Sequence, residues 1–111
     1  MSGRRSRNKG KRGERELVNL IAEHCGDGVA KRNLQQTAEG GYDLAGPIAD
    51  IAAVECKNEV TFRLTSWMRQ AEEQAGPEQV PVVAHRQYGG GFRFYLSMDE
   101  QEFMQWIRER L

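Results

Sequence analysis

The sequence IADIAAVECK, at residues 48–57, gives the clearest indication of how this 111-residue chain folds. Residues 48–56 are largely apolar and partly β-branched, a composition that favours a buried central strand. In a strand, Glu55 and Lys57 point to the same face, and Cys56 points to the other. Charged groups beside a buried strand are costly unless they are paired or bind a metal. The pattern therefore predicts a carboxylate and an ammonium group held together on one face of the strand.

The sequence on both sides of this strand predicts an α/β fold. Apolar residues at helical spacing predict two helices, at residues 14–25 and 64–75. Ser97 and Glu100 have the spacing of a capping box, which predicts a third helix after them. The other segments with the character of short strands are residues 28–34, 43–45, 80–85 and 92–96. This order of elements predicts a single domain with a central mixed sheet flanked by helices.

Charge is unevenly distributed along the chain. The 16 basic and 16 acidic residues give a formal net charge of zero, which taken alone argues against a generally basic nucleic-acid binder. By position, however, residues 1–15 carry a net charge of +6 and the remainder carries −6. The asymmetry predicts a flexible basic arm over residues 1–12 and a folded domain over residues 13–111. Such arms often bind nucleic acid through its phosphates.

Several classes of protein are not expected. No apolar run approaches the ~20 residues that span a bilayer, and no apolar stretch follows the basic N-terminus, as a secretory signal would require. Two cysteines, Cys25 and Cys56, are too few for a disulfide scaffold. Together with His24 and His85, they are too widely scattered to predict a structural zinc site. We therefore expect a cytoplasmic protein, in a bacterial, archaeal or phage-infected cell, with no membrane partner and no small-molecule cofactor.

A second carboxylate completes the chemical pattern. The sequence GGYD at residues 40–43 is followed, after eleven residues, by ECK at residues 55–57. If Asp43 lies on a neighbouring strand, two carboxylates and a lysine meet at one place. Two carboxylates suit Mg²⁺, which at a phosphodiester activates water, neutralises the phosphate and stabilises the leaving oxygen. A lysine there can orient the attacking water or help deprotonate it. The pattern predicts hydrolysis of a nucleic-acid backbone.

Two other interpretations of these residues stay open. Asp50 competes with Asp43 as the acidic partner because it lies five residues before Glu55. That odd spacing places Asp50 on the opposite face of a regular strand, so we favour Asp43. The alternative for Glu55 and Lys57 is an ordinary salt bridge without a role in catalysis.

The motif Asp-(x)11-Glu-x-Lys resembles the signature of the PD-(D/E)XK nuclease superfamily. The sequence KGKRGEREL at residues 9–17 resembles the first-helix motif of archaeal-type Holliday junction resolvases, which belong to that superfamily. RNLQQ at residues 32–36, with GGYD at residues 40–43, resembles related resolvase-like nucleases of phages. The resemblance spans roughly residues 9–96 and implies a single-domain restriction-endonuclease-like fold. Its αβββαβ core would be followed here by a C-terminal strand and helix.

The resemblance also implies roles for individual residues. Asp43 and Glu55 match the metal ligands, and Lys57 matches the catalytic lysine. Glu14 matches the first-helix glutamate that completes the catalytic site. The backbone carbonyl of Cys56 is implied as a further metal ligand. The implied cofactor is Mg²⁺, for which Mn²⁺ can substitute.

The sequence departs from the family pattern in three places near the site, one of which is an extra Gly46-Pro47 after Asp43. Tyr42 stands where the family signature has proline. The arginine expected between the first helix and the aspartate has no single match, because either Arg32 or Gln36 can fill its place. Acids favour the first turn of a helix in any protein, so the role of Glu14 depends on the resemblance. Glu16 lies about 200° further around a helix from Glu14 and is expected to face solvent.

The implied substrate is branched DNA, most specifically a four-way junction, cut by a Holliday junction resolvase. Two symmetric cuts need two sites, so a C2 homodimer is expected, formed through either the C-terminal helix or the strand at residues 92–96. Gln70 is a weaker candidate for a polar residue near the site, and Trp67, Phe103 and Trp106 are expected in the core or at the subunit interface. The residues expected to bind nucleic acid are Arg7, Lys9, Lys11, Arg12, Arg15, Arg32 and Gln36. The alternatives are another nuclease of the superfamily (flap, nicking or restriction-type) and a nucleic-acid-binding module without catalysis.

Overall fold

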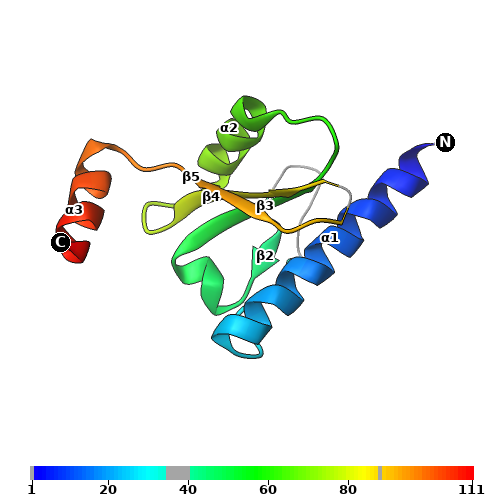
Figure 1. The fold of residues 1–111 in the computed structure, drawn as a ribbon, viewed down its shortest axis with the longest axis horizontal. Coiled ribbons are helices and arrows are strands. Elements are labelled where there is room, and N and C mark those ends of the chain that lie inside the picture. Colours follow the sequence, from blue (N-terminus) through cyan, green and yellow to red (C-terminus); the bar gives the residue numbers. More distant parts are fainter. Residues whose placement is uncertain (1, 35–40, 88) are drawn as a thin grey trace.

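The computed structural model describes residues 2–34, 41–87 and 89–111, with side chains from Lys9 onward. The elements follow one another in the order α1 (Ser2–Cys25), β1 (Lys31–Arg32), β2 (Leu44–Ala45), η1 (Pro47–Asp50), β3 (Ala52–Asn58), α2 (Leu64–Gln74), β4 (Val80–Arg86), β5 (Arg93–Leu96) and α3 (Glu100–Arg110). This is the predicted order, and the chain forms one α/β domain in which helices flank a mixed sheet (Figure 1).

Strand β3 forms where the sequence predicted a central strand, but it lies at one edge of the three-stranded sheet, whose order is β3-β4-β5. It pairs in parallel with β4, and β4 pairs antiparallel with β5. The short strands β1 and β2 form a separate antiparallel pair. The backbone N–H of Asp43 donates to the carbonyl of Val54 at 2.9 Å, which joins this pair to β3. The predicted neighbouring segment therefore does lie beside β3.

Each face of the sheet is covered by one helix. Leu17 of α1 is fully buried and packs with Val54 and Ala84 on one face. Trp67 of α2 packs against Val83 on the other face, which confirms a place in the core for this tryptophan. Glu55 is opposite Val83 in the β3–β4 register. Because opposite residues in a sheet share a face, Glu55 lies on the face that α2 covers.

Helix α1 begins earlier than predicted. We expected a helix from Glu14 and a flexible arm over residues 1–12, but the structure has one continuous helix from Ser2. The glycines in this segment favoured the prediction of an arm, yet Gly13 is what allows the helix to pass close to β3. A Cβ atom at Gly13 would lie 2.9 Å from the Cβ of Asn58. Asn58 Nδ2 also donates to the carbonyl of Lys9 at 3.1 Å, which ties α1 to the strand.

The segment before β3 and the start of α3 also differ from the predictions. Residues 48–50 belong to the 3-10 helix η1 instead of the strand, because Pro47 favours the first turn of a helix. At α3 the N-cap is Asp99, whose side chain accepts from the N–H of Glu102 at 2.8 Å, so the capping box lies two residues further on than predicted. Ser97 instead donates its hydroxyl to Glu72 at 2.6 Å.

Length and apolar character together decide whether a helix can cross a membrane. No helix in the part of the chain that the structure describes has both to the degree required.

The close approach at Gly13 gives a test of the fold. Gly13→Ala is expected to lower the free energy of unfolding by about 1–3 kcal/mol, because the new methyl group collides with Asn58. Gly10→Ala is the matched control, since a Cβ there meets nothing within 4 Å. Its higher helix propensity should raise stability by up to ~1 kcal/mol. Denaturant unfolding measures both, and an equal gain in the two variants would contradict the packing of α1 on β3.

Candidate active site

Asp43 lies immediately before β2, where the β1–β2 pair meets β3. Its side chain is mostly buried, with 8% of the residue exposed. Asp43 Oδ2 accepts the backbone N–H of Cys56 at 2.7 Å, which fixes the carboxylate beside β3. The N–H and C=O of one residue in a strand point to the same side. The carbonyl of Cys56 therefore points toward the side on which Asp43 lies.

Glu55 and Lys57 share one face of β3, as their spacing indicated. Glu55 is 1% exposed, and its Oε2 lies 4.0 Å from Nζ of Lys57. Lys57 Nζ also donates to Oε1 of Gln70 on α2 at 3.2 Å, so this helix holds the ammonium group in place. Within the described part of the chain, the second oxygen of Glu55, Oε1, is buried without a hydrogen-bond partner.

Glu14 approaches the same place from α1. Its Oε1 accepts a hydrogen bond from Nε of Arg32 at 3.1 Å, and both side chains are partly buried. Glu14 and Asp43 each raise the pKa of Glu55, as nearby negative charges do. The four residues expected to be catalytic therefore lie in one electrostatic neighbourhood: Glu14, Asp43, Glu55 and Lys57.

Burial and neighbouring carboxylates disfavour the ionised forms of the acidic residues at this site. Burial, followed by the charge of Asp43, raises the pKa of Glu55 to about 8, against the opposing effect of Lys57. Burial is also the main reason why the pKa of Glu14 is raised, followed by the charge of Asp43, while Arg32 acts in the opposite direction. Burial and these carboxylates raise the pKa of the Cys56 thiol to about 12, so this cysteine stays protonated near neutral pH.

These features fit a bound divalent cation. A cation beside Glu55 could be coordinated by Oε1, which has no hydrogen-bond partner among the described residues. The cation would also favour the ionised form of the carboxyl group. Among the described residues, no three Asp, Glu, His or Cys side chains lie together as a set of metal ligands. Mg²⁺ commonly takes only one or two protein carboxylates and keeps several waters. Asp43, Glu55 and the carbonyl of Cys56 match that smaller donor set.

The competing acid, Asp50, is not part of this cluster. It lies exposed in η1, outside the strand on which it was expected. The structure therefore brings Asp43, not Asp50, into contact with β3 beside Glu55.

The residues expected to bind nucleic acid have different surroundings. Lys11, Arg12 and Arg15 are exposed on α1, close to the helical residue Glu14, and Lys9 is half-buried. Arg32 is tied to Glu14. The side chain of Arg7 and the whole of Gln36 lie outside the described residues, so Arg32 is the described candidate for the arginine of the family pattern.

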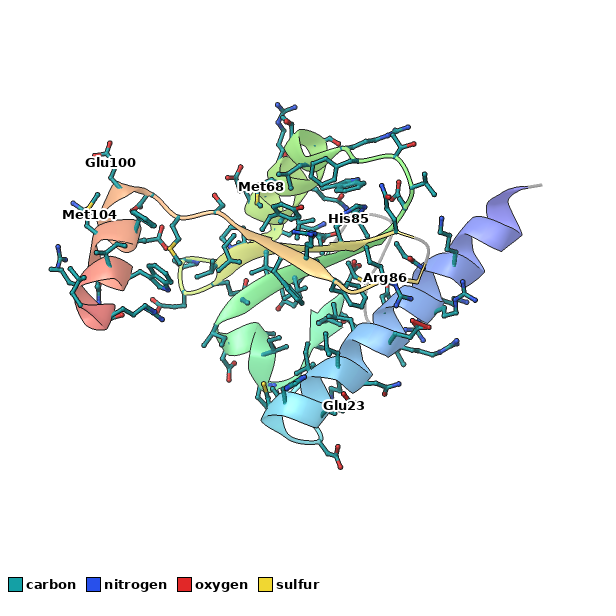
Figure 2. The ribbon with its side chains drawn as sticks, viewed as in Figure 1. Glu23, Met68, His85, Arg86, Glu100 and Met104 are labelled. Carbon is teal, nitrogen blue, oxygen red and sulfur yellow. The ribbon has the colours of Figure 1, made fainter. Side chains whose placement is uncertain are left out.

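A second polar cluster, which sequence reasoning missed, fastens α1 to the end of β3. Arg86 of β4 is 6% exposed, and its Nη2 forms an ion pair with Glu16, which was expected to face solvent. Arg86 Nε also donates to Oδ1 of Asn58 at 3.2 Å. Figure 2 shows Arg86 between the sheet and α1. A charged residue at the end of an apolar strand was the available signal, but its partner is far away in the sequence.

Comparisons with protein-family models, with curated proteins and with solved structures find no match to this chain. The interpretation of the site therefore depends on its geometry and charge.

The raised pKa of Glu55 predicts how stability depends on pH. The folded protein keeps a proton on this carboxyl group that the unfolded chain releases above its ordinary pKa of 4.5. Raising the pH from 4.5 toward 8 should therefore lower the free energy of unfolding, by on the order of 2–5 kcal/mol. Glu55→Gln, which cannot ionise, should lose most of that slope and be more stable than the natural protein at pH 8.

Denaturant unfolding at pH 5, 6, 7 and 8 without divalent cations measures this dependence. Glu23→Gln, on the exposed side of α1, is the matched control and should keep the original slope. An unchanged slope in Glu55→Gln would show that Glu55 is not the group responsible.

Proposed function

We propose that this protein is a Mg²⁺-dependent endonuclease that hydrolyses phosphodiester bonds in branched DNA, most specifically in a four-way junction. The observation that carries the proposal is the buried, partly unsatisfied carboxyl group of Glu55. Two further carboxylates, from Asp43 and Glu14, are near enough to raise its pKa, and the ammonium group of Lys57 lies 4.0 Å from its Oε2. Such a group is costly in a folded protein unless it has a use. The resemblance to resolvase-like nucleases links this cluster to DNA.

Asp43 and Glu55, with the carbonyl of Cys56, would hold the metal ion. When bound, the ion supplies charge neutralisation at the phosphate, activation of water and stabilisation of the leaving oxygen. The hydrogen bond from the N–H of Cys56 keeps Asp43 oriented for this task. The low exposure of Glu55 excludes bulk water, which strengthens every electrostatic interaction at the site.

Among the described residues, Lys57 is the group best placed to act on the substrate. Gln70 accepts one of its N–H bonds, so the ammonium group is oriented while its remaining donors can reach a water or a phosphate oxygen. Its positive charge offsets charge that develops in the transition state. Arg32 keeps Glu14 oriented at the edge of the site. Glu14 would then accept hydrogen bonds from water around the metal ion.

The basic half of α1 supports binding of DNA. Lys11, Arg12 and Arg15 are exposed on the same helix that carries Glu14, so phosphates bound to them would lie near the catalytic cluster. Contacts of this kind fix a duplex in position without reading its sequence. Recognition by the shape of a junction would follow from such contacts. Two symmetric cuts would need a second chain related by a two-fold axis.

The direct test is cleavage of a labelled four-way junction with and without Mg²⁺. Asp43→Asn should lower the cleavage rate at least ~100-fold, because even partners of metal ligands cost ~10–100-fold when they are changed. Binding of the junction, measured in Ca²⁺ or EDTA, should be largely retained. Asp50→Asn removes the same charge from an exposed position outside the cluster and should cut at the natural rate.

The outcomes of this assay separate the alternatives. Paired incisions in the junction, with little cutting of linear duplex, support a resolvase. Preferential cutting of flaps, nicks or linear duplex would move the proposal to another nuclease of the same superfamily. Junction binding without any Mg²⁺-stimulated cleavage by the natural protein would favour a nucleic-acid-binding module instead.

A further inference from the structure

Helix α3 lies apart from the sheet and from the two helices that cover it. Figure 1 shows it at the far end of the molecule from the N-terminus, beyond the end of β5, and Figure 2 shows Glu100 and Met104 there. Against the described residues of its own chain, α3 buries none of its side chains. Phe103 is 44% exposed and Met104 52% exposed, which is unusual for large apolar residues.

Four side chains of α3, three exposed and one (Ile107) half-buried, form a stripe in which the order of side-chain types is symmetric. Glu100, Phe103, Ile107 and Arg110 follow at intervals of three, four and three residues, the spacing of one helix face. The stripe therefore runs acid, apolar, apolar, base. When a second copy of the helix is laid against it in the opposite direction, Glu100 meets Arg110 at both ends and Phe103 meets Ile107 in between.

We infer that α3 is the docking surface for a second copy of this chain, paired antiparallel about a two-fold axis. In a two-fold interface the same patch serves both partners, so a contact from residue i to residue j is repeated from j to i. The stripe satisfies that condition: two Phe103–Ile107 contacts form the middle of the interface, and a Glu100–Arg110 pair lies at each end. A parallel pairing would instead place Glu100 against Glu100 and Arg110 against Arg110.

The apolar surface continues from α3 toward the sheet. Leu96, Met98, Phe103 and Trp106 line a hollow of about 290 Å³ between α3 and the end of β5. Leu96 is itself 53% exposed. An 11-residue helix is only about 16 Å long, so two of them alone form a small interface. We therefore expect a dimer that includes this hollow and dissociates in the micromolar range.

The role that we give to this dimer, which is to supply the second cutting site, rests on the proposed function. The charge pattern does not depend on it, and oligomeric state measured without DNA tests the two separately. A dimer through α3 that cuts no DNA would leave the inference standing and remove the proposed nuclease. A protein that cuts junctions but stays monomeric would do the reverse.

The test uses sedimentation equilibrium of the full chain from 1 to 300 µM. The variants Glu100→Arg and Arg110→Glu each place like charges at both ends of the interface, so each alone should dimerise at least ~10-fold more weakly. Mixed in equal amounts, they should form a heterodimer about as readily as the natural chain forms its homodimer. The double variant, Glu100→Arg with Arg110→Glu, should also recover the homodimer.

Gln105→Arg is the matched control, because residue 105 lies on the opposite side of α3 from the stripe. It adds a charge to the same helix and should leave the dissociation constant unchanged. A natural chain that stays monomeric up to 300 µM would overturn the inference. So would a mixture of the two single variants that associates no better than either alone.

Discussion

The fold buries the carboxyl group of Glu55 in a place that disfavours its ionised form. The residue is 1% exposed, one of its oxygens has no hydrogen-bond partner among the described residues, and its pKa is raised to about 8 by burial and by Asp43. A protein optimised only for stability would place an apolar side chain at this position of β3. The remaining features of the site can be understood as what keeps this group in place and makes it useful.

Three elements converge on β3 to do so. The Asp43 carboxylate is aligned by the N–H of Cys56, although this brings a second negative charge close to Glu55. Helix α2 contributes Gln70, which holds Lys57 near enough to offset part of that charge. Helix α1 brings a further carboxylate and the exposed bases that could bind phosphate. A cluster of acids beside a basic helix surface is an arrangement suited to a metal ion and a polyanion together.

Much of this site could be predicted because its key spacing is local. Glu55 and Lys57 share a face by the two-residue period of a strand. The same rule led us to prefer Asp43 over Asp50, although Asp50 in fact lies in η1, before the strand. What could not be predicted depends on contacts between distant segments. The burial of Arg86 needs a partner on α1, and the close approach at Gly13 needs the Asn58 side chain of β3. From the sequence alone, a glycine predicts a flexible segment, and its role in close packing becomes visible only when the surface packed against it is known.

The most direct test of the central claim is a calorimetric titration of the protein with Mg²⁺ in buffers of different ionisation enthalpy. If Glu55 is a metal ligand that is protonated in the free protein near pH 7, binding must release a proton, and affinity must increase from pH 6 to pH 8. Glu55→Gln should lose both the proton release and most of the affinity. Binding that is equally tight in Glu55→Gln, or that releases no proton at pH 7, would contradict the account.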